Sequence, residues 1–109
     1  MNCKPKLINK SGEELLLFHI DRFLIDYPAY AKKMADAVIF YAEEMTAIGP
    51  TKLQRRYYIK YSVADGIVKS LRAAKAVRHL HEPIRDEVCL DREQAERLAE
   101  YILSRVQRA

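Results

Sequence analysis

Glycine and proline are scarce in this chain, with three glycines and four prolines among 109 residues. Because these two residues supply most turns, their shortage leaves little loop material. Three isolated glycines also cannot build the glycine-rich loop of a P-loop or a dinucleotide-binding fingerprint. The sequence therefore argues against nucleotide-binding enzymes of those two kinds.

Cysteine is equally scarce, since Cys3 and Cys89 are the only two. Two thiols do not make a disulfide framework, so we expect both to be free, with a Cys3–Cys89 bridge as the alternative. No apolar run reaches the roughly 18 residues that a membrane span needs, and the N-terminus lacks the apolar core of a signal peptide. These absences predict a cytoplasmic protein that does not contact a membrane.

Motifs for catalysis and metal binding are missing as well. The sequence has no HExxH, no paired CxxC and no GxSxG. His79 and His81 lie near Cys89, but two helical residues two apart point about 200° away from each other. We therefore predict no metal, no cofactor and no catalytic residue, and expect a protein that acts by binding.

What the chain does contain favours helices. Half of the residues are hydrophobic and 31% are charged, with many alanines, leucines, glutamates, lysines and arginines. This composition predicts one all-α domain over residues 11–109, preceded by a flexible basic arm at 1–10.

Three helices can be placed from their ends. The pattern Ser11-Gly12-Glu13-Glu14 predicts a capping box that starts a helix running to about residue 26. A second helix over about 28–48 shows an apolar seam and ends at Gly49-Pro50. The last helix begins at Asp91, with Gln94 three residues on. With the central segment they predict a bundle of four helices.

The central segment, about 51–82, is predicted to be one long helix. Thr51-Lys52-Leu53-Gln54 fits a capping box, and Pro83 ends the segment. Its apolar residues recur at intervals of three or four: Ile59, Val63, Ile67, Leu71, Ala74 and Val77. Two interpretations of Gly66 stay open, a close crossing with another helix or a break that divides the segment.

The same segment carries the charge of the protein. Its eight basic and two acidic residues give +6, against +4 for the whole chain. A basic face that also bears tyrosine is typical of a binding surface. The candidate residues are Arg55, Arg56, Tyr58, Lys60, Lys69 and Arg72.

Two functions fit that surface. The first is a regulatory or adaptor protein, or an inhibitor, that binds a protein partner with an acidic surface. The alternative is a nucleic-acid-binding regulator, because basic and aromatic residues are interleaved in RRYYIKY. The apolar stripe of a helix this long has no evident cover within its own chain, which also predicts a homodimer.

Overall fold

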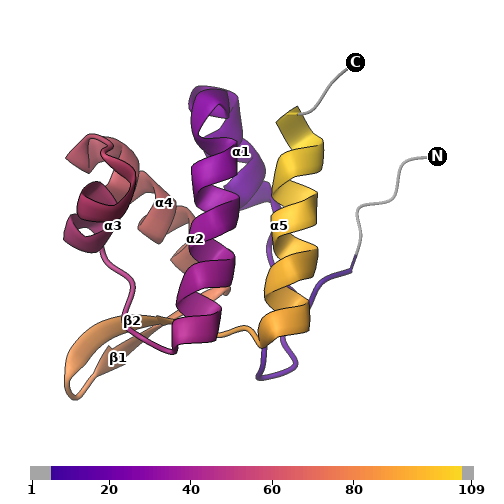
Figure 1. Cartoon of the computed structure of the whole chain (residues 1–109). Coiled ribbons are helices and arrows are strands. Elements are labelled where there is room, and N and C mark those ends of the chain that lie inside the picture. Colours follow the sequence, from indigo (N-terminus) through magenta and orange to yellow (C-terminus); the bar gives the residue numbers. More distant parts are fainter. Residues whose placement is uncertain (1–5, 107–109) are drawn as a thin grey trace.

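The computed structural model describes residues 6–106, where the chain forms five α-helices, a short 3-10 helix and one β-hairpin (Figure 1). The predicted all-α four-helix bundle is therefore wrong, and the chain is a mixed α/β domain. The elements are α1 (Phe18–Asp26), η1 (Pro28–Tyr30), α2 (Ala31–Glu44), α3 (Pro50–Tyr57), α4 (Tyr61–Ala73), β1 (Val77–His81), β2 (Ile84–Val88) and α5 (Arg92–Val106).

The predicted long helix over 51–82 is divided into α3, α4 and β1. Helix α3 ends at Tyr57 and is followed by Tyr58, whose backbone is left-handed with φ +55°, and Lys60 is extended before α4 begins. The apolar spacing from Ile59 onward is that of α4, and Ile59 itself is buried. The apolar pattern continues across the turn, so a break at this point could not be predicted from the spacing of apolar residues.

Gly66 lies inside α4 and does not break it. A Cβ added at this position would lie 3.1 Å from Cε1 of Phe23 on α1. The interpretation of Gly66 as a close helix crossing is thus confirmed, and the proposed division at this residue is wrong.

The hairpin was not predicted. Strands β1 and β2 pair from Val77 with Val88 to His81 with Ile84, and Glu82 and Pro83 form the link between them. Ile48, in the link between α2 and α3, pairs with Asp86 and donates its N–H to the Asp86 carbonyl at 2.9 Å. The hairpin is therefore fixed to the chain on both sides of the α3–α4 unit.

Helices α2 and α5 lie side by side, with α2 in the middle of the view in Figure 1 and α5 to its right. The start of α5 is as predicted: Asp91 Oδ1 accepts the Gln94 N–H at 2.8 Å, and Gln94 Oε1 accepts the Asp91 N–H at 3.0 Å. Helix α2 ends at Glu44, with Met45 as its C-cap, so the second helix is shorter than predicted, and Gly49 precedes α3 in an extended conformation.

The first helix begins at Phe18 and not at Ser11. The predicted capping box fails because the Asn9 side chain organises this stretch, accepting the N–H groups of Ser11 and Glu13 at 2.9 and 3.0 Å. Of the predicted arm, residues 1–5 lie outside the described residues, whereas Leu7 and Asn9 are buried.

One core joins these elements. Helix α1 packs on α4 and α5, and α3 packs on α4. The largest fully buried side chains are Ile20, Met34, Leu53, Ile67, Leu71, Leu90, Leu98 and Ile102. The apolar stripe of the central segment is buried within its own chain, so the observation that suggested a homodimer no longer holds, and the homodimer stays a prediction.

Candidate functional site

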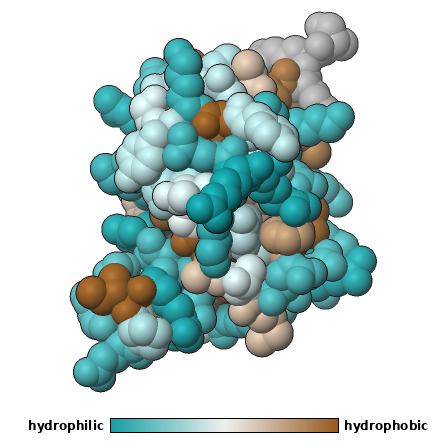
Figure 2. Space-filling model, turned by 60° about the vertical axis from the view of Figure 1, so that its left-hand side comes forward, coloured by the Kyte–Doolittle hydropathy of each residue, from teal (hydrophilic) through white to brown (hydrophobic). Residues whose placement is uncertain are grey.

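The predicted binding residues fall into two groups. Arg55, Arg56, Tyr58 and Lys60 lie on the end of α3 and the turn that follows, whereas Lys69 and Arg72 lie on α4. Figure 2 brings the side of α3 and the hairpin forward and shows a mostly hydrophilic surface with scattered hydrophobic patches.

Arg56 holds α3 against α2. Its guanidinium carbon lies 3.5 Å from the centre of the Phe40 ring, and its Nε lies 3.9 Å from the Asp36 carboxylate. Tyr57 donates its hydroxyl to the same carboxylate at 2.5 Å. Burial and then this hydrogen bond raise the pKa of Tyr57 well above its ordinary value. We therefore assign Arg56 a structural role and remove it from the binding surface.

The turn presents free cations and a tyrosine. Tyr58 is 91% exposed, although its left-handed backbone conformation is unfavourable for any residue with a Cβ. Arg55 and Lys60 are exposed, and neither forms an ion pair within residues 6–106. These three side chains are available to a ligand without breaking an existing interaction.

The exposed face of α4 carries two cations that are already paired. Lys69 Nζ lies 2.9 Å from the Asp65 carboxylate, one helical turn earlier. This hydrogen bond, together with the charge of Asp65, raises the pKa of Lys69. Because Lys69 is largely exposed and Asp65 partly so, a phosphate can replace Asp65 as the partner of Lys69 at little cost.

Arg72 is held more firmly than Lys69, by Asp86, a residue that was not predicted to belong to the site. Its Nη2 donates to the Asp86 carboxylate at 2.7 Å, and His79 Nδ1 lies 2.9 Å from the other carboxylate oxygen. The Asp86 side chain is only 12% exposed. Asp86 thus joins α4, both strands and, through its backbone pairing with Ile48, the link before α3. The only feature of the sequence that could have indicated the role of Asp86 is the position of this acid in the short stretch 84–88, where apolar and charged residues are mixed.

The hairpin adds further side chains beside α4. Arg78, His81 and Arg85 are exposed, and Ile84 at the turn is 77% exposed. Arg85 pairs with Glu87 at 2.8 Å, whereas Arg78 forms no ion pair in the described part of the chain. These residues were not predicted to belong to the surface, because residues up to 82 were expected to be helical and 83–90 to be a connector.

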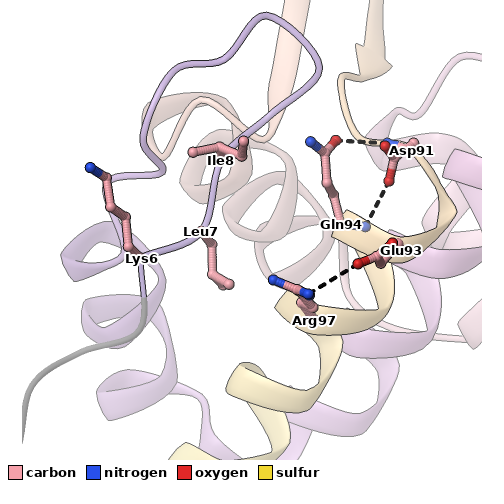
Figure 3. A pocket seen from close by; sticks show the side chains of 7 residues that line it. All are labelled: Lys6, Leu7, Ile8, Asp91, Glu93, Gln94 and Arg97. Atoms are coloured by element: carbon pink, nitrogen blue, oxygen red, sulfur yellow. Dashed lines mark hydrogen bonds and ion pairs between the residues drawn. The ribbon is translucent and has the colours of Figure 1, made fainter.

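A cavity of about 190 Å³ lies elsewhere, between the N-terminal segment and the start of α5 (Figure 3). Its polar side chains interact with one another: Gln94 and Asp91 form the helix cap, and Arg97 donates to Glu93 at 3.0 Å. In the close-up, Lys6 points away from these residues. The cavity therefore offers no unsatisfied polar group to a ligand.

The histidine, cysteine and acidic side chains of residues 6–106 do not assemble into a metal site. No three His, Cys, Asp or Glu side chains are grouped to hold a metal ion there. His79 and His81 share one face of β1 with ring centres 4.8 Å apart, so the expectation that they diverge is wrong. Cys89 is buried with a free thiol, and Cys3 lies outside the described residues.

No helix in the described range is long and apolar enough to cross a membrane. Comparison with protein-family models, with curated proteins and with solved structures finds no match to this chain. The function of the protein therefore has to be inferred from the geometry of its own surface.

Proposed function

We propose that the protein is a regulator that binds double-stranded nucleic acid through α3, α4 and the hairpin. The observation that carries the proposal is the division of the central segment: two helices joined by residues 58–60, with the second helix exposed along one side. A helix-turn-helix of this kind places its second helix in the major groove of DNA.

The surroundings of the two helices support the same function. A short pairing at Ile48 precedes α3, and a β-hairpin follows α4. This element order is that of winged helix-turn-helix domains. Because the hairpin is anchored to α4 through Asp86, a duplex on α4 also meets the cations of the hairpin.

The side chains on the surface suit both phosphate and base contacts. Arg55 and Lys60 at the turn and Arg78 on β1 can neutralise phosphates. On α4, Lys69 and Arg72 can donate to guanine, and Asp65 can accept from the amino group of cytosine. These types favour a site that contains G·C pairs.

A protein partner is the second candidate, and exposed apolar side chains favour it. Tyr58, in the turn after α3, is 91% exposed, and Ile84, at the turn of the hairpin, is 77% exposed. A partner with an acidic surface and an apolar patch would fit both. We place either activity in the cytoplasm, where a free thiol such as Cys89 is stable.

One experiment separates the two functions. The protein is captured with its partners from its native host, with and without nuclease treatment. Partners that are lost after nuclease treatment support nucleic-acid binding, whereas partners that are retained support a protein ligand. In parallel, duplex and single-stranded DNA of mixed sequence are titrated with purified protein at about 50 mM salt. Failure of every probe to bind contradicts the primary proposal.

A further inference from the structure

We infer that the groove between α1 and α4 receives the sugar–phosphate backbone of the nucleic acid that lies on α4. The inference rests on the proposed function and adds α1 to the binding surface. It was not visible in the sequence, because α1 and α4 are separated by more than thirty residues and meet only in the folded chain.

The groove has a volume of about 270 Å³ and is hollow because the α4 residues along its floor have small side chains. Gly66, Ser70 and Ala73 line it from α4, and the buried Phe23 ring forms part of its floor from α1. The close approach of Gly66 to Phe23 shows that no larger residue fits there without moving the ring. An apolar floor of this kind suits the sugar of a backbone.

The rim of the groove is mainly basic. Arg22 and His19 project from α1, Lys69 lies on the α4 side, and Asp26 is the single acidic residue lining it. Arg22 is exposed and has no ion pair within residues 6–106. A free guanidinium can bind a phosphate through two parallel hydrogen bonds. The groove therefore favours an anion with an apolar portion.

The position of the groove identifies that anion. Lys69 belongs both to the rim and to the exposed face of α4, so no element separates the two surfaces. A duplex that places its major groove on α4 must run its backbone along the sides of this helix. The hairpin lies on one side of α4, and α1 with Arg22 lies on another.

The test compares Arg22→Gln with Arg97→Gln, which removes an exposed arginine from α5, on the far side of α2 from α3 (Figure 1). Binding of a duplex is measured by fluorescence anisotropy between about 50 and 200 mM salt. Loss of one phosphate contact makes the plot of log K, where K is the binding constant, against log[salt] less steep by about 0.9. The affinity at 100 mM salt is then about eightfold weaker. We expect this change for R22Q and wild-type behaviour for R97Q.

Three outcomes overturn the inference. If R22Q keeps the wild-type slope while the wild type binds, α1 makes no backbone contact and the proposed function stands. If the wild type binds no duplex, both this inference and the proposed function are wrong. If inorganic phosphate, at constant ionic strength, produces saturable NMR shifts at His19 and Arg22 and the R22Q slope is unchanged, the groove takes a free anion instead. Thermal unfolding monitored by circular dichroism checks that both variants are folded.

Discussion

Among residues 6–106, three residues with a Cβ adopt a left-handed backbone: Met45, Tyr58 and Lys75, with φ of +53°, +55° and +71°. Each lies at the C-terminal end of a helix, where glycine is the usual residue. A left-handed conformation costs a residue other than glycine roughly 1–2 kcal/mol. Such a cost at an exposed aromatic residue is often associated with function, and Tyr58 is the most exposed of the large hydrophobic residues.

Replacing Tyr58 with glycine should therefore separate stability from binding. We expect Tyr58→Gly to raise the free energy of unfolding by about 0.5–1 kcal/mol, because glycine adopts this conformation without steric cost. The same variant should lose at least about fivefold in affinity for nucleic acid, the factor that 1 kcal/mol gives. Urea unfolding and anisotropy measure the two quantities.

Met45→Gly is the matched control, since Met45 is also left-handed and 79% exposed but lies at the end of α2. It should gain similar stability and bind as the wild type does. If Tyr58→Gly binds as tightly as Met45→Gly, Tyr58 does not contact the ligand.

Tyr101 gives a prediction about pH. Its hydroxyl donates to Asp21 at 2.7 Å from α5 to α1, and burial followed by this hydrogen bond raises the pKa of Tyr101 to about 12. An unfolded tyrosine ionises near pH 10, so the unfolded state loses its proton first as the pH rises. The stabilisation is therefore complete below about pH 10 and is lost as the pH approaches 12.

The variant Tyr101→Phe should be less stable than the wild type at pH 8, by about 1 kcal/mol for the lost hydrogen bond. The difference should shrink between about pH 10 and 12. Denaturant unfolding across this range measures it. A difference that stays constant or grows with pH would contradict the assignment.

At the scale of elements, the hairpin acts as a support for α4. Asp86 accepts hydrogen bonds from Arg72 on α4 and from His79 on β1, and its own backbone pairs with Ile48. The carboxylate is largely shielded from water, whereas the Arg72 and His79 side chains are partly exposed, so its removal breaks two interactions of a shielded acid.

We expect Asp86→Ala to destabilise the protein by about 1–3 kcal/mol. Glu87→Ala is the control, because Glu87 is the next residue on the same strand and forms a more exposed pair with Arg85. Glu87→Ala should lower the free energy of unfolding, measured with urea, by less than half as much as Asp86→Ala does. Equal losses for the two variants would show that Asp86 does not connect the elements as described.

Sequence could predict the parts of this fold that depend on local chemistry. The cap at Asp91 and Gln94 needs only two residues three apart, and Gly66 signals a close approach wherever its partner lies. The division at Tyr58 and the hairpin depend on distant partners. Strand 77–81 continues an apolar helical spacing, and only its pairing with 84–88 and with Ile48 makes it a strand.

The candidate binding site also contains residues that could be predicted from local sequence and residues that could not. Arg55, Tyr58 and Lys60 were predicted and are exposed, but Arg56 looks identical to Arg55 in sequence and is engaged by Phe40 and Asp36. Arg22 and Arg78 were not predicted, because their position beside α4 depends on how α1 and the hairpin pack.

At the scale of the whole molecule, charge is unevenly distributed, and the described cations without ion pairs include Arg22, Arg55, Lys60 and Arg78 around α4. If each contacts a phosphate, about four counterions are released on binding. Affinity for a duplex should then fall roughly a hundredfold between about 50 and 200 mM salt. A decrease of less than about threefold would mean that phosphate contacts contribute little.

Subunit number is also a property at this scale. Light scattering at micromolar concentration compares the mass in solution with the 12.7 kDa of one chain. A mass of one chain would rule out the predicted homodimer. Twice that mass would support the predicted homodimer. Its interface would then differ from the apolar stripe of the central segment, which is buried within the chain.

Asn9 has a consequence for how the chain is synthesised. Its side chain donates to the Lys75 carbonyl at 2.8 Å, its carbonyl accepts from Gln94 at 3.2 Å, and the neighbouring Lys10 N–H donates to Cys89 at 2.9 Å. The first described residues are thus joined to elements that the ribosome makes much later. The N-terminal segment must wait for these partners, so we expect the native state to form only after residue 94 has left the exit tunnel.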